Sequence, residues 1–242
     1  QSEQTVCGIG TYNPNHGGVV SSSCLPSDPG HFVDQEGQSS QQECGVGTYQ
    51  PSGSSEACLN SSEGHFVDLP AQASQTPCPV GEFQPYTGRS ECLLADEGHY
   101  VDAQGQSTQT ECPAGTFNPI TGSSSVVDCV VAEPGFFVSE LDGGGQINQA
   151  ACSAGTYNPN IGSTSETACK DTRPGHYSPT PGQANQTPCP VGQSQSEWGA
   201  TSCNLAEPGS YVDEVGQSYD SECPMGWYSS SYGATECNEA DL

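Results

Sequence analysis

Two related stretches decide the fold: GHFVDQEGQSSQQEC at residues 30–44 and GTFNPITGSSSVVDC at residues 115–129. Both follow one formula, which is a Gly, any residue, an aromatic, a polar turn, a run of Ser, Thr or Gln, and a Cys. Thirteen such half-repeats can be read along the 242-residue chain, and only Ser194 stands where the aromatic is expected. Self-similarity at a fixed period is the signature of a repeat architecture.

The chemistry of a half-repeat predicts its local structure. The Gly suggests a backbone position with positive φ or a close approach of another strand. The Pro, Gly, Asn and Ser residues favour turns, and no stretch has a sustained helical period. The aromatic is the only large apolar group, so we expect it to cover its neighbours as a spine. These features predict small disulfide-rich tandem repeats that form an elongated rod of short irregular β-strands and turns, with almost no helix.

Composition supports covalent stabilisation of this fold. Only 32% of the residues are hydrophobic, whereas Gly (30) and Pro (19) make up about a fifth of the chain. Such a chain cannot build one ordinary core, so it must be disordered or held by covalent links. The even number of cysteines, 14, indicates a disulfide framework and therefore an extracellular or cell-surface location.

The cysteines divide the chain into seven repeats, each with a first and a second cysteine. The spacing within a repeat is shorter between Cys44 and Cys58 than between Cys112 and Cys129. The first cysteines are Cys7, Cys44, Cys78, Cys112, Cys152, Cys189 and Cys223, and the second are Cys24, Cys58, Cys92, Cys129, Cys169, Cys203 and Cys237. The expected repeats are 1–24 (truncated at its start), 25–58, 59–92, 93–129, 130–169, 170–203 and 204–237, with 238–242 starting a further repeat.

Two disulfide registers remain open on spacing alone. Pairing each first cysteine with the second of the same repeat closes short loops, which is the simpler ladder and the one we favour. The alternative joins each second cysteine to the next first one, for example Cys24 to Cys44.

The charge balance excludes several classes of partner. The chain has 3 basic residues against 29 acidic ones, a formal net charge of −26. Without a basic footprint, binding to nucleic acid is not expected, and an anionic membrane surface is disfavoured. The sequence has no apolar run of about 18 residues, so we expect no direct membrane insertion in this segment.

The openings of the repeats resemble a known group of domains. CPAGTFNP at residues 112–119 and CGVGTYQP at residues 44–51 resemble the start of ephrin-receptor-like cysteine-rich repeats. The same opening, closed by a cysteine a short loop later, resembles the first module of tumour-necrosis-factor-receptor-like domains, in which those two cysteines are bonded. Repeats of this kind occur in large extracellular surface or flagellar-hair proteins of protists and algae. The resemblance thus implies a protein of that kind and supports the first register.

The candidate binding and modification sites are few. A His recurs at one repeat position, at His31, His65, His99 and His176, and three of these are followed by Asp34, Asp68 or Asp102. We interpret these His as turn caps and expect no metal and no cofactor, with calcium on carboxylates as the alternative. No catalytic motif is present, so an enzyme is not expected. Asn60 and Asn185 begin N-glycosylation sequons, which predicts attached glycans.

Uniform repeats favour a structural role. We expect an extracellular repeat segment of a filament, flagellar hair, stalk or surface coat, whose partner is itself, either as a polymer or as part of a longer array. The matches of residues 1–7 and 237–242 to the interior of other repeats suggest this. The alternative is the ectodomain of a receptor or adhesin that binds a protein ligand. Its candidate surface is in region 112–169, which contains Val126, Val127, Val130, Val131 and the insertion Gly143–Gly145.

Overall fold

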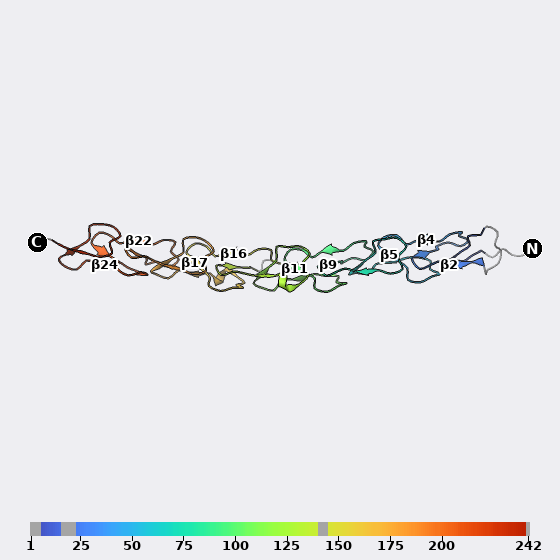
Figure 1. The fold of residues 1–242 in the computed structure, drawn as a ribbon, viewed down its shortest axis with the longest axis horizontal. Coiled ribbons are helices and arrows are strands. Elements are labelled where there is room, and N and C mark those ends of the chain that lie inside the picture. Colours follow the sequence, from blue (N-terminus) through green and yellow to red (C-terminus); the bar gives the residue numbers. More distant parts are fainter. Residues whose placement is uncertain (1–5, 16–22, 140–144, 241–242) are drawn as a thin grey trace, which may run out of the picture. The chain divides into compact units, whose positions relative to one another are not determined.

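The computed structural model describes residues 6–15, 23–139 and 145–240. These residues form thirteen two-stranded antiparallel sheets, each a hairpin of two-residue strands. Figure 1 labels several of these strands, among them β5 and β17. They contain no α-helix, and the short 3-10 turns include η2 (Val126–Asp128) and η3 (Glu166–Ala168). Residues 1–5 and 241–242 of the end matches, and Gly143 and Gly144 of the insertion, lie outside the described residues. The strand content and the near absence of helix are as the sequence predicts.

The chain divides into two compact units. Unit 1 consists of residues 1–111 and 120–128, and unit 2 of residues 112–119 and 129–242. The hairpins of unit 1 are β1 (Thr11–Tyr12) with β2 (Leu25–Pro26), β3 (His31–Phe32) with β4 (Gln42–Glu43), β5 (Thr48–Tyr49) with β6 (Leu59–Asn60), β7 (His65–Phe66) with β8 (Thr76–Pro77), β9 (Glu82–Phe83) with β10 (Leu93–Leu94), and β11 (His99–Tyr100) with β12 (Thr110–Glu111).

Unit 2 repeats the same element. Its hairpins are β13 (Thr116–Phe117) with β14 (Val130–Val131), β15 (Phe136–Phe137) with β16 (Ala150–Ala151), β17 (Thr156–Tyr157) with β18 (Lys170–Asp171), β19 (His176–Tyr177) with β20 (Thr187–Pro188), β21 (Gln193–Ser194) with β22 (Asn204–Leu205), β23 (Ser210–Tyr211) with β24 (Ser221–Glu222), and β25 (Trp227–Tyr228) with β26 (Asn238–Glu239).

Each hairpin begins directly after the Gly of its half-repeat. This Gly has positive φ in every case, for example 81° at Gly10 and 82° at Gly81. A Cβ built on Gly10 would lie 2.5 Å from the carbonyl oxygen of Ser54, and one on Gly81 would lie 2.5 Å from that of Gly122. Both reasons that the sequence suggests for Gly therefore hold at the same position.

Much of the interior of each unit is a column formed by the residue that follows the aromatic. Val67 and Val101 are 1% and 2% exposed, whereas the aromatic rings before them are only half-buried. Polar residues alternate with valine along most of this column, and Ser178 takes one of the valine positions. The buried members are Val33, Gln50, Val67, Gln84, Val101, Asn118, Val138, Asn158, Ser178, Gln195, Val212 and Ser229. The expected aromatic spine is thus corrected: the rings flank a column of smaller side chains, because strands two residues long leave no room to enclose a ring.

Successive hairpins within a unit are joined by main-chain hydrogen bonds. Between hairpins β7–β8 and β9–β10, Gly64 N–H donates to the Gln84 carbonyl at 2.8 Å and Val67 N–H to the Arg89 carbonyl at 3.0 Å. Gly88 N–H donates back to the Ser61 carbonyl at 2.8 Å. The next hairpin thus satisfies backbone groups that two-residue strands cannot pair internally.

Candidate functional site

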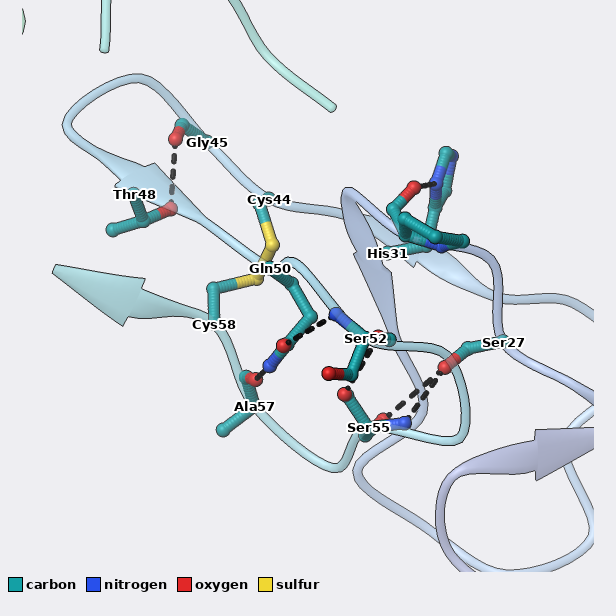
Figure 2. Close-up of a disulfide and its surroundings, with 11 residues drawn as sticks. Ser27, His31, Cys44, Gly45, Thr48, Gln50, Ser52, Ser55, Ala57 and Cys58 are labelled. Atoms are coloured by element: carbon teal, nitrogen blue, oxygen red, sulfur yellow. Dashed lines mark hydrogen bonds between the residues drawn. A yellow bond between two sulfur atoms is a disulfide. The ribbon is translucent and has the colours of Figure 1, made fainter. Parts of the chain in front are cut away.

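The hairpins are of two alternating kinds, and the first kind is closed by a disulfide. We call these the disulfide hairpins. In the hairpin β5–β6, Cys44 and Cys58 are bonded with a Cα–Cα distance of 5.7 Å, and Cys58 directly precedes the second strand (Figure 2). Seven disulfides follow this rule, which is the register the sequence favours: Cys7–Cys24, Cys44–Cys58, Cys78–Cys92, Cys112–Cys129, Cys152–Cys169, Cys189–Cys203 and Cys223–Cys237.

A buried amide holds the loop of the disulfide hairpin. Gln50 is 7% exposed, and its Nε2 donates to the Ala57 carbonyl at 2.7 Å, while its Oε1 accepts from Ser52 N–H at 3.2 Å (Figure 2). Thr48, the first residue of β5, donates through its Oγ1 to the carbonyl of Gly45 in the turn before the strand, at 2.7 Å (Figure 2). A buried amide that is satisfied on both ends fixes a loop more specifically than an apolar side chain would.

The second kind of hairpin has a glutamine, or Asp220 in β23–β24, where the first has its second cysteine. We call these the glutamine hairpins. In β7–β8, Gln75 directly precedes the second strand, its Oε1 accepts from Ser62 N–H at 2.6 Å and its Nε2 donates to Ser62 Oγ at 3.3 Å. In β11–β12, Gln109 makes the same pair of bonds with Asp96, at 2.7 and 2.6 Å. This amide clasp replaces the disulfide.

The clasp recurs through both units, and the sequence analysis did not predict it. Its members are Gln41, Gln75 and Gln109 in unit 1 and Gln149, Gln186 and Asp220 in unit 2. Each occupies the position that the second cysteine takes in the preceding hairpin, so an alignment of the half-repeats on their common period would find it.

Hairpins of the same kind also touch one another. In unit 1, a Cβ on Gly47 would collide with the carbonyl of Gly88, two hairpins further along, and one on Gly64 would collide with that of Gly105. Second-strand side chains take part as well, because the Asn60 Cγ lies 3.4 Å from the position of a Gly88 Cβ. Within each unit, disulfide hairpins therefore form one row and glutamine hairpins another.

The repeated His residues act locally. The Nδ1 atoms of His31, His65, His99 and His176 lie 3.2, 3.0, 3.0 and 3.3 Å from the carbonyl oxygen two residues earlier. Since a carbonyl only accepts, Nδ1 carries the proton in each ring. The geometry is that of a turn cap, as the sequence suggests, and Phe136 and Ser210 take the position in two other hairpins.

The carboxylates that follow the His do not gather into a metal centre in the described residues. Asp34 Oδ1 accepts from Gln42 Nε2 at 2.9 Å, and Asp34, Asp68 and Asp102 are exposed. Among the described residues, no three His, Cys, Asp or Glu side chains are grouped so that they could hold an ion. Calcium binding stays an untested alternative from the sequence.

The two sequons occupy different environments. Asn60 is exposed on β6 and its side chain lies against Gly88, while Ser62 of its sequon is held by the Gln75 clasp. Asn185 is exposed in the bend before β20, one residue before the clasp residue Gln186. Both sequons therefore adjoin a glutamine clasp.

The candidate receptor surface has exposed apolar side chains. Val126 and Val127, in η2 of unit 1, are 45% and 81% exposed. Val130 and Val131, in β14 of unit 2, are 48% and 47% exposed.

Comparison with known proteins leaves the fold as the main guide to function. Neither a scan against models of known protein families nor a search of curated proteins finds a match for this chain. No helix in the described part of the chain is long and apolar enough to cross a membrane. By its structure, the chain consists of cysteine-rich tandem repeats, and the residues that the structure describes form thirteen small hairpins, seven of them closed by a disulfide.

Proposed function

We propose that this chain is a repeat segment of an extracellular structural element, such as a filament, flagellar hair, stalk or surface coat. The observation that carries the proposal is the interface between successive hairpins. In unit 2, Gly175 N–H donates to the Gln195 carbonyl at 2.6 Å, Ser178 N–H to Ala200 at 2.9 Å, and Gly199 N–H to Thr172 at 2.9 Å, as in unit 1. A fold whose main-chain groups form hydrogen bonds to the neighbouring hairpins can be extended by adding further hairpins.

The alternating clasps suit such a role outside the cell. Each disulfide stays closed in an oxidising environment, and the glutamine clasps need no redox partner. The resemblance to ephrin-receptor-like and tumour-necrosis-factor-receptor-like repeats supports the same setting, and we assign the chain to that type as part of the proposal. The large negative charge, −26, favours solubility of single chains through mutual repulsion.

Glycans belong to the proposal. Asn185 and Asn60 are both exposed, although the Asn60 side chain lies against Gly88. Mass spectrometry of the secreted protein before and after enzymatic removal of N-glycans tests this. A mass that does not change would remove glycans at both residues from the proposal.

The proposed role is tested best on native material. Electron microscopy of the protein extracted from its source should show a regular polymer or coat in which the repeat recurs along one axis. Isolated single chains with no periodic assembly would contradict the structural role.

An ectodomain of a receptor or adhesin is the second candidate. It is favoured by Val127, a large apolar side chain of η2 that is 81% exposed. Cross-linking of the chain on the cell surface to a distinct protein, lost on Val127→Asp, would select this role over the first.

A further inference from the structure

Charge is segregated between the two kinds of hairpin in unit 1. The glutamine hairpins, residues 27–43, 61–77 and 95–111, have no basic residue and ten carboxylates: Asp28, Asp34, Glu36, Glu43, Glu63, Asp68, Asp96, Glu97, Asp102 and Glu111. The disulfide hairpins, residues 7–26, 44–60 and 78–94, have only Glu56, Glu82 and Glu91, and also Arg89. The disulfide row is therefore nearly neutral.

Exposed apolar side chains follow the opposite distribution. Among the described residues of these three disulfide hairpins, eight large apolar side chains are 44% to 59% exposed: Ile9, Leu25, Val46, Leu59, Val80, Tyr86, Leu93 and Leu94. The described part of the three glutamine hairpins has one, Leu69 at 57%. Unit 1 thus has an apolar row and an acidic row.

The apolar row is periodic. Leu25, Leu59 and Leu93 each directly follow the second cysteine of their own repeat, and they are 45%, 49% and 44% exposed. Each leucine lies across the hairpin from an aromatic, as in the pairs Leu59 with Tyr49 and Leu93 with Phe83. The equivalent residues of the glutamine hairpins are Gln42, Thr76 and Thr110, which are polar.

We propose that the disulfide row of unit 1 is the lateral contact surface for a second copy of this chain. This inference rests on the proposed structural role and names the face through which copies associate. A partner that matches the row must present apolar groups at the same spacing, and a second copy does so by construction. Contact through this row also keeps the ten carboxylates of the glutamine row out of the interface.

The available area fits a weak contact that depends on repeat number. A fully buried Val or Leu hides roughly 60–120 Å² of surface, so eight half-exposed side chains offer roughly 250–500 Å². A standard interface contains about 450 Å² of apolar area on each partner. Three disulfide hairpins therefore reach this value only when most of the row is covered, and longer arrays gain through multivalency.

The test is sedimentation equilibrium of the full chain, freed of N-glycans because Asn60 adjoins Leu59 in this row, at about 0.01 M and about 1 M salt, where the Debye length is about 30 Å and about 3 Å. We expect self-association that strengthens with salt, because salt screens the acidic chains and leaves apolar contacts intact. The double variant Leu59→Glu, Leu93→Glu should weaken association at least about tenfold. The matched control Thr76→Glu, Thr110→Glu adds the same charge at the equivalent strand position in the acidic row, and should change it less than about threefold.

As a control for folding, each variant should be assayed for free thiols, and a correctly folded variant should have none, as in the wild-type chain. A second variant, Leu59→Thr, Leu93→Thr, places the residue that the glutamine hairpins already carry at this position, and it should also weaken association. The proposal would be overturned if Thr76→Glu, Thr110→Glu weakened self-association as much as Leu59→Glu, Leu93→Glu does. A wild-type chain that stays monomeric at both salt concentrations would overturn this interface as well, while the structural role would still be decided by imaging native material.

Discussion

The close approach between successive glutamine hairpins predicts that Gly64→Ala is costly although it adds a single methyl group. Gly64 is buried with φ of 74°, and a Cβ would collide with the carbonyl of Gly105. Its N–H donates to the Gln84 carbonyl at 2.8 Å, and its carbonyl accepts from Cys78 N–H at 2.8 Å. The left-handed conformation costs about 1–2 kcal/mol in alanine. Weakening two hydrogen bonds costs about 0.5–1.5 kcal/mol each, so the total is about 2–5 kcal/mol.

Native-state hydrogen exchange measures this cost locally, because a repeat protein can open one segment at a time. A loss of about 2–5 kcal/mol lowers the protection factors of the residue-64 and Cys78 amides by roughly 30-fold to several thousand-fold. Gly45→Ala is the matched control, since Gly45 is exposed and a Cβ there would meet nothing within 4 Å. If Gly64→Ala lowers protection no more than Gly45→Ala, successive glutamine hairpins are not in tight contact and the two-row arrangement is wrong.

Three further outcomes follow from a glutamine clasp, a buried loop amide and a disulfide. Gln109→Ala removes the acceptor of Asp96 N–H, so we expect a loss of about 1 kcal/mol, seen as faster exchange of the Asp96 amide; unchanged exchange would contradict the clasp. Gln84→Leu leaves the Glu91 carbonyl and Tyr86 N–H unpaired, so unfolding of that loop should become easier by about 1–3 kcal/mol, and denaturant titration that shows equal or higher stability would refute this. Reduction of a disulfide with sequence separation 14 should lower the free energy of unfolding by about 3 kcal/mol. An unaltered thermal transition after reduction would contradict this and show that the other hydrogen bonds of the hairpin are enough to hold it.

Much of the fold could be predicted because the residues that recur in every repeat, Gly and Cys, allow few conformations at their positions. Gly at the hairpin start has to be Gly, since Gly10 combines a φ of 81° with a carbonyl oxygen 2.5 Å from its absent Cβ. Disulfide geometry likewise permits short local loops, and the structure pairs Cys44 with Cys58 over a separation of 14. Such constraints act mostly within one hairpin, which is why a single sequence reveals them.

The interior column could not be predicted from hydrophobicity. Val67 is fully buried beside polar neighbours in the column, Gln50 and Gln84, whose amides bond to their own loops. A search for the core by apolar character finds the aromatics instead. The position can be recognised only when the half-repeats are aligned, because it then holds valine or a small polar or amide residue in each one.

The polar residue in this column also differs between the shorter and the longer disulfide loops, and this difference explains how the repeat tolerates longer loops. Three of the loops closed by disulfides with a separation of 14 have Gln50, Gln84 and Gln195 in the column, and the fourth has Ser229. The described loops with a separation of 17 have Asn118 and Asn158 instead. Gln50 reaches the carbonyl of Ala57, the residue before the second cysteine.

In the longer loop closed by Cys169, the three residues before that cysteine form η3, and the amide in the column is the shorter Asn158. Asn158 donates instead to Ser163 Oγ at 2.8 Å. The hydrogen bonds to the neighbouring hairpins are unchanged, since Asn158 N–H still donates to the Gln183 carbonyl at 3.0 Å and Gly162 N–H to the Ala132 carbonyl at 2.8 Å. The added residues are thus absorbed on the surface while the stacking interface is kept. A repeat built in this way can vary what it displays without changing how its hairpins assemble.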